Sequence, residues 1–288
     1  MLATFVITLR EGFEAALLLG IVYACLDRFG ARAHYRWVTL GGALGLVASI
    51  LMGIAVTFLS GPLLDLGPDL VGAAVIFAAV GLLTWHGWWM SRHARAMGRD
   101  VQRRVAEAEA TRRLSVLGLI AFTGVFREGA ETVLFLWGLM SQTAEGAGWG
   151  GLTGGVLGVL TAAALGWTIF RGGTRLSVRH FFAVTSIVLL FLAAGLFSTG
   201  LGKLQGLGVL PATDALWDTS ALLSDHSVLG GFLSGLVGYR ARPSLLEVAA
   251  YVAYVAVAGT LFFGVAGPTP DHPLRAAGAE SGIDEPEP

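Results

Sequence analysis

The chain carries the stretch Phe5-Val-Ile-Thr-Leu-Arg-Glu-Gly-Phe-Glu14 near its start and the stretch Phe122-Thr-Gly-Val-Phe-Arg-Glu-Gly-Ala-Glu131 near its middle. The two align without a gap at Phe, Arg, Glu, Gly and Glu. Their shared pattern, Arg-Glu-Gly-x-Glu, occurs only at residues 10–14 (the first motif) and 127–131 (the second motif). The fold must therefore place three ionisable side chains, twice, inside apolar surroundings.

The composition is that of a membrane protein. Of the 288 residues, 55% are hydrophobic and 14% are charged, and the mean hydropathy is +0.70. Soluble proteins carry about 25% charged residues, so a soluble enzyme, a disordered chain and a nucleic-acid-binding protein are excluded. The net charge of −1 indicates no polyanionic partner, and the single cysteine, Cys25, excludes a disulfide framework and a cysteine-based zinc site. We expect an all-α polytopic membrane protein.

Seven segments are apolar enough over the roughly 20 residues that a helix needs to cross a bilayer. Five contain long uncharged runs, and the first and fourth carry the motifs. The first segment lacks the basic start of a signal peptide, so we expect it to remain as a helix. The predicted transmembrane helices cover about 2–26, 37–60, 70–91, 114–141, 149–170, 181–201 and 244–266.

These helices form one transmembrane domain, residues 1–266. A cytoplasmic loop, 92–113, is expected to form a short solvated helix. The outer loop, 202–243, is too long to lack structure in a compact protein, and its stretch 228–239 is too short to span, so we expect it to be interfacial or re-entrant. The Pro-rich acidic tail, 267–288, is expected to be disordered in the cytoplasm.

The basic residues predict the orientation. Thirteen of the 19 Lys and Arg residues lie in the first, third and fifth connections, and the second and fourth connections have none. Because basic loops stay in the cytoplasm, we expect a multi-pass protein of the cell inner (plasma) membrane with its N-terminus outside and its C-terminus inside.

The same orientation makes the two motif helices enter the membrane from opposite sides. Helices 1–3 and 4–6 are therefore predicted to form an inverted repeat, with helix 7 outside it. In transporters of that kind the substrate site lies near the midplane, between the repeats. At 1.5 Å per residue, the motif glutamates lie roughly 15–25 Å along their helices, in the middle or outer half of a core about 30 Å thick.

Glycine spacing adds a packing prediction. Gly41 and Gly45 in helix 2, and Gly150, Gly154 and Gly158 in helix 5, are spaced for close helix crossing. These helices are equivalent in the two proposed repeats. We interpret the glycines as packing seams rather than as parts of a ligand site.

The motif charges predict a cation site. Within each motif, the two glutamates (Glu11 with Glu14, and Glu128 with Glu131) are three residues apart, so they project from one side of the helix. A charge at the bilayer centre costs at least about 2.5–3.5 kcal/mol. Intrahelical Arg–Glu pairing could serve packing alone, but the four glutamates outnumber the two arginines, Arg10 and Arg127. The charges sum to −2 when all are ionised, which favours cation binding.

Four carboxylates without sulfur form a hard oxygen site, suited to Fe³⁺, Mn²⁺, Ca²⁺ or Mg²⁺. Five of the six histidines lie at or beyond the predicted membrane edges, and only His86 lies within a span. Its neighbours Trp85, Trp88 and Trp89 indicate an interfacial aromatic belt. We therefore assign His86 to that belt, with a proton or metal role as the alternative.

Two Arg-Glu-Gly-x-Glu motifs, in the first and fourth of seven helices, resemble those of the high-affinity iron permeases, the oxidase-dependent iron transporter family. The similarity extends through Trp217-Asp-Thr-Ser220 and Arg242-Pro-Ser244, a region that resembles the bacterial members. The resemblance implies a permease rather than an enzyme. It implies that iron, as Fe²⁺ or Fe³⁺, is the transported substrate, that no cofactor is tightly bound, and that Glu11, Glu14, Glu128 and Glu131 bind the metal.

The resemblance also implies supporting roles for Arg10 and Arg127 and a separate extracytoplasmic redox or iron-binding partner protein. An outer vestibule is a further candidate, formed by Asp214, Asp218, Asp225 and His226, unless these residues only solvate the loop. Two alternatives stay open: a transporter of another hard cation, such as Mn²⁺ or Pb²⁺, and a membrane metal-dependent oxidoreductase.

Overall fold

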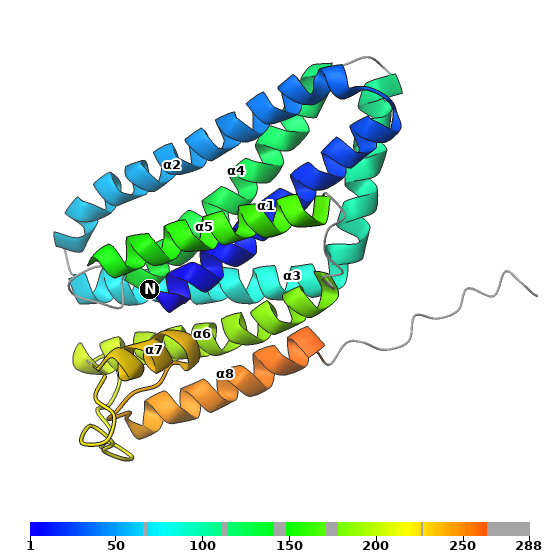
Figure 1. The fold of residues 1–288 in the computed structure, drawn as a ribbon. Helices are drawn as coiled ribbons and strands as arrows, with labels where there is room; N and C mark the ends of the chain where they lie inside the picture. Colours follow the sequence, from blue (N-terminus) through cyan, green and yellow to red (C-terminus); the bar gives the residue numbers. More distant parts are fainter. Residues whose placement is uncertain (66–67, 111–113, 141–147, 171–177, 226, 264–288) are drawn as a thin grey trace, which may run out of the picture.

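A computed structural model of the chain describes residues 1–65, 68–110, 114–140, 148–170, 178–225 and 227–263. The regular elements of these residues are all helical (Figure 1). In chain order they are α1 (Leu2–Arg28), the 3-10 helix η1 (Arg32–His34), α2 (Tyr35–Asp65), α3 (Pro68–Ala110), α4 (Leu114–Met140), α5 (Gly148–Phe170), α6 (Val178–Gly206), α7 (Val228–Val237) and α8 (Leu245–Phe263). The predicted tail, 267–288, lies outside the described residues.

Five helices in the described part of the chain are long and apolar enough to cross a membrane, so the protein is a multi-pass membrane protein. Their apolar segments are Arg32–Leu59, Asp69–Met90, Gly150–Ile169, His180–Gly206 and Leu245–Phe262. The two motif helices, α1 and α4, are 27 residues long each, but each carries three charged motif residues.

One boundary differs from the sequence prediction. Residues 92–110 do not form a separate helix in a loop, because α3 continues without interruption from Pro68 to Ala110. In Figure 1 the second part of α3 rises beside the C-terminal end of α1 and the start of α4. Val101, Val105 and Ala108 join a buried apolar cluster with residues of α1, α2 and α4. Burial of this face explains why the helix persists beyond the apolar span.

The glycines of α2 form a close seam with α4, as their spacing predicts. A β-carbon at Gly41 would clash with the backbone of Gly118, and one at Gly45 would lie 2.8 Å from the carbonyl oxygen of Phe122. Only a residue without a side chain permits this approach. The seam joins α2 to the helix that carries the second motif.

The glycines of α5 form the matching seam with α1. A β-carbon at Gly154 would clash with the carbonyl oxygen of Met1, and one at Gly158 would lie 2.6 Å from that of Phe5. Gly150 has more room, since its nearest neighbour is the β-carbon of Met1 at 3.9 Å. The two motif helices are therefore each held by a glycine-bearing partner helix.

Within the predicted outer loop, residues Val228–Val237 form the short helix α7, which is too short to span a membrane. The Ser227 hydroxyl caps its start by accepting a hydrogen bond from the Gly230 amide at 2.9 Å. Gly238 ends it with a φ of 70°, a left-handed conformation, where its backbone lies against Gly195 of α6. Glycine is required there by both the conformation and the contact.

Candidate metal site

Helices α1, α3 and α4 pack against one another and bring the charged residues of both motifs together. In Figure 1, α1 and α4 run in opposite directions across the bundle. The structure thus places side by side two motifs that are more than a hundred residues apart in the sequence. The cluster consists of Arg10, Glu11 and Glu14 of α1, His86 of α3, and Arg127, Glu128 and Glu131 of α4.

The glycine inside each motif lies at a helix crossing. A β-carbon at Gly12 would lie 3.0 Å from the β-carbon of Ala162 in α5, and one at Gly129 would clash with the side chain of Ser49 in α2. Each motif helix is therefore pressed against its partner on the glycine side. This contact fixes the rotation of α1 and α4, and with it the direction of the glutamates.

The first motif is buried completely. Arg10 Nη1 lies 2.6 Å from Oε1 of Glu11, and Arg10 Nη2 lies 3.1 Å from Oε1 of Glu14. The three residues are 1%, 0% and 6% exposed. One guanidinium therefore bridges both carboxylates of its own motif.

The second motif is more open. Arg127 Nε donates to Oε1 of Glu131 at 3.1 Å and lies 3.9 Å from Oε1 of Glu128. The Arg127 side chain is 42% exposed, and its guanidinium carbon lies 4.6 Å from the centre of the Trp89 ring. Glu128 is 4% exposed and faces the interior.

Potential ligand atoms of the two motifs converge. Oxygen and nitrogen atoms of Glu11, Glu14 and His86 lie within 4.8 Å of one another, as do carboxylate oxygens of Glu11, Glu128 and Glu131. Glu11 belongs to both groups. The four glutamates predicted from the sequence therefore face one shared space.

Several of these oxygens have no hydrogen-bond donor in the described part of the chain. They are the Oε2 atoms of Glu11, Glu14, Glu128 and Glu131. A buried carboxylate oxygen without a donor is costly. A cation coordinated by these oxygens would remove that cost, which suits the cluster to metal binding.

A cavity of about 290 Å³ leads to the second motif. Arg127 and Glu128 line it, together with Asp100 and Arg104 of the α3 extension. Trp89 forms part of the same wall, beneath the Arg127 guanidinium. The cavity explains why Arg127 is exposed while Arg10 is not.

The chain also matches a known protein family. The family model described as "Iron permease FTR1 family" matches residues 1–266. The chain belongs to this family. It is therefore an iron permease by family, and its relatives are named as transporters rather than enzymes.

Among the similar proteins are bacterial permeases. The ferrous iron permease EfeU of Yersinia pestis is 31% identical over 266 residues, covering 91% of this chain and 93% of the relative. The ferrous iron permease EfeU of Escherichia coli O6:K15:H31 is 32% identical over 261 residues, covering 88% and 92%. No solved structure matches this chain.

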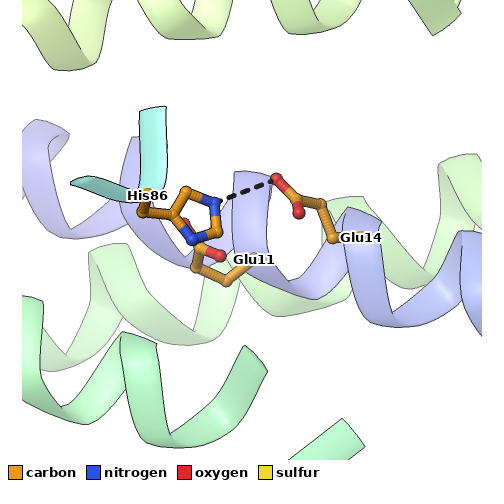
Figure 2. Close-up of side chains that lie close together, drawn as sticks. All are labelled: Glu11, Glu14 and His86. Atoms are coloured by element: carbon orange, nitrogen blue, oxygen red, sulfur yellow. Dashed lines mark ion pairs between the residues drawn. The ribbon is translucent and has the colours of Figure 1, made fainter. Parts of the chain in front are cut away.

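The assignment of His86 to an interfacial aromatic belt is wrong for this permease. His86 is 4% exposed, and its Nε2 atom lies 3.7 Å from Oε1 of Glu14. Figure 2 shows its imidazole, carried by α3, facing the carboxylates of Glu11 and Glu14 on α1. Its Nδ1 atom contacts Oε2 of Glu131. The sequence did indicate a role for His86, because it is an ionisable residue inside a predicted membrane span. Such residues are functional candidates by default.

The residues of the predicted outer loop have varied surroundings in this permease. Asp218 accepts hydrogen bonds from the Ser220 amide and hydroxyl and pairs with Arg242 at 2.6 Å. Hydrogen bonds from Arg242 and Ser220 hold the pKa of Asp218 well below its usual range. Asp225 accepts from the Ala241 amide at 2.8 Å. Asp214 is exposed, and His226 lies outside the described residues.

Proposed function

We propose that this protein imports ferrous iron across the cytoplasmic membrane through one site, built from both motifs. The bacterial relatives are named for ferrous iron, and the convergence of glutamates from both motifs carries the proposal. The four carboxylates and two guanidiniums sum to −2, so one Fe²⁺ brings the charge to zero. Glu11, Glu14, Glu128 and Glu131 would bind the ion, and Arg10 and Arg127 would offset half of the negative charge of the empty site.

The proposed transport unit has seven transmembrane helices, including α1 and α4. Burial of the motif charges between helices supports this count, since intramembrane charges face the interior of a bundle. We propose that α1–α3 and α4–α6 form an inverted repeat, with α8 outside it. The glycine seams support the repeat, because Gly154 packs against the backbone of Met1 in the same way that Gly41 packs against the backbone of Gly118. Met1 precedes the first motif by as many residues as Gly118 precedes the second.

The proposed path runs from the outer loop to the cavity beside Arg127. The basic residues of the α3 extension support a cytoplasmic position for that cavity, in an inner-membrane protein with its N-terminus outside. Asp100, which lines this cavity together with Glu128, would then receive the ion as it leaves the site. The outer aspartates stay candidates for a vestibule, where an extracytoplasmic redox or iron-binding protein would deliver iron.

Uptake assays with separate metals test this function. Radioactive iron is offered as Fe²⁺ under reducing conditions, and as Fe³⁺, to proteoliposomes that contain the full chain. We expect Fe²⁺ to enter and the Glu14→Gln variant to abolish its entry, whereas Glu107→Gln on the exposed face of α3 transports normally. Entry of Mn²⁺ or Pb²⁺ without iron would support the alternative hard-cation transporter, and substrate turnover without entry would support an oxidoreductase.

A further inference from the structure

We propose that His86 is a ligand of the transported ion, and that its nitrogen gives the site a preference for Fe²⁺ over Mn²⁺ and Mg²⁺. The proposal rests on the proposed function, since it assigns one more donor to the same site. Neither motif contains His86, which comes from a third helix. The iron site would thus have donors from α1, α3 and α4.

The position of the ring supports ligation. The side chain is buried, and Nε2 has no hydrogen-bond partner in the described part of the chain, although a ring nitrogen is a strong hydrogen-bonding group. Nε2 lies 3.7 Å from Oε1 of Glu14, a separation that leaves a metal room to lie beside both atoms. His86 also belongs to the group with Glu11 and Glu14 whose ligand atoms all lie within 4.8 Å of one another.

The second ring nitrogen lies against a carboxylate, the kind of group that often orients a metal-binding histidine. Nδ1 of His86 contacts Oε2 of Glu131, whose other oxygen, Oε1, accepts a hydrogen bond from Arg127. A histidine that binds a metal through one nitrogen nearly always donates a hydrogen bond from the other, often to a carboxylate, which fixes the tautomer and the ring orientation. Glu131 and Arg127 thereby hold Nε2 toward the first motif.

Packing alone does not account for this arrangement. The ring makes an edge contact with Phe135, with centroids 6.2 Å apart, which any aromatic or apolar side chain could supply. A histidine placed only for packing would not need both nitrogens aimed at carboxylates of two different motifs. The ring instead links Glu14 of α1 to Glu131 of α4.

The chemical consequence is selectivity. A site of carboxylates alone suits Mg²⁺, Ca²⁺ and Mn²⁺, whereas imidazole favours iron and the later divalent metals. One nitrogen among four carboxylates therefore moves the preference from Mn²⁺ toward Fe²⁺. The same donor would also admit Co²⁺ and Zn²⁺ more readily than an oxygen-only site would.

Pulsed electron paramagnetic resonance on the purified full-length protein loaded with Mn²⁺ tests the ligand directly. We expect nitrogen coupling from one imidazole in the parent protein and in the His180→Gln control, and none in His86→Gln. Labelling the histidine ring nitrogens isotopically identifies the source even where the variant does not fold. Mn²⁺ that binds without nitrogen coupling, and is lost in Glu11→Gln, overturns the role of His86 but leaves the carboxylate site intact.

A competition assay measures the selectivity. Loss of an orienting partner of a metal ligand weakens binding about 10–100-fold, so loss of the nitrogen ligand itself should weaken Fe²⁺ binding at least as much. Mn²⁺, which carboxylates suit, should be affected less, so the preference for Fe²⁺ over Mn²⁺ should fall. Gln keeps a hydrogen-bond donor at position 86 but lacks the ring nitrogen. If His86→Gln leaves the preference for Fe²⁺ over Mn²⁺ unchanged, the ring only positions its neighbours and is not a ligand. Binding of Mn²⁺ that is unaffected by Glu11→Gln would instead contradict the proposed function itself.

Discussion

Arg10 and Arg127 occupy the same position in the two motifs, yet the Arg10 side chain is 1% exposed and the Arg127 side chain is 42% exposed. Each pairs with the glutamate one helical turn later, at 3.1 Å in both cases. The difference lies in the surroundings, because the cavity beside Trp89 and Asp100 reaches only Arg127. This asymmetry is what we expect of an inverted repeat whose site is open toward one side of the membrane.

The asymmetry predicts unequal effects of the two arginines on stability. Arg10→Gln leaves Glu11 and Glu14 buried without their cation, a change that costs about 3–5 kcal/mol for a buried pair. Arg127→Gln removes a partly exposed pair and a contact with Trp89, so we expect about 1 kcal/mol. Thermal unfolding in detergent measures both changes. Equal losses of stability in the two variants would contradict a buried first motif and an open second motif.

The glycine seams predict where small substitutions are harmful. A β-carbon at Gly41 or Gly154 meets the backbone of the neighbouring helix, so Ala at either position should destabilise the bundle by about 1–3 kcal/mol, as overpacking does. Gly81 of α3 is the matched control, because a β-carbon there meets nothing within 4 Å. Thermal unfolding compares the three variants, and a Gly81→Ala loss as large as the others would refute the seam interpretation.

The proposed orientation predicts which exposed positions react from outside the cell. In a Cys25→Ala background, cysteine is introduced at Glu107 of the α3 extension or at Asp214 of the outer loop, both exposed positions. A membrane-impermeant maleimide applied to whole cells should label position 214 alone. Permeabilised cells, in which position 107 also reacts, serve as the control. Labelling of position 107 alone would contradict the proposed orientation and, with it, the proposed direction of transport.

The two outer aspartates should differ in their effect on iron capture. The Asp218 carboxylate already pairs with Arg242 and Ser220, and these contacts lower its pKa. The pairing is therefore fully present above the ordinary aspartate pKa. It is lost only as the pH falls through the lower pKa of the folded protein. We therefore expect Asp218→Asn to leave the half-saturating iron concentration at neutral pH unchanged. Asp214→Asn should raise that concentration. Uptake titrations measure both, and the reverse ranking argues against a vestibule around Asp214.

The motifs and most helix positions could be predicted from the sequence because charges inside apolar runs form a conspicuous pattern. The extension of α3 beyond its apolar span was harder to predict, since hydropathy marks where a span ends but not where a helix ends. Residues 101–110 are rich in Ala, Glu and Arg, which favour helix. His86 was misassigned because a single residue has no periodicity. Its role depends on how α3 is rotated against α1 and α4, which is a property of the packing.

The central claim is that both motifs build one metal site. Equilibrium binding of Fe²⁺ to the purified full-length protein, without oxygen, tests it most directly, with Glu107→Gln as the control. We predict that one ion binds per chain. Binding should be lost in Glu11→Gln, because Glu11 belongs to both ligand groups. It should be lost equally in Glu128→Gln, which changes the other motif. Binding of two ions per chain, with a substitution in each motif removing only one of them, would contradict the shared site.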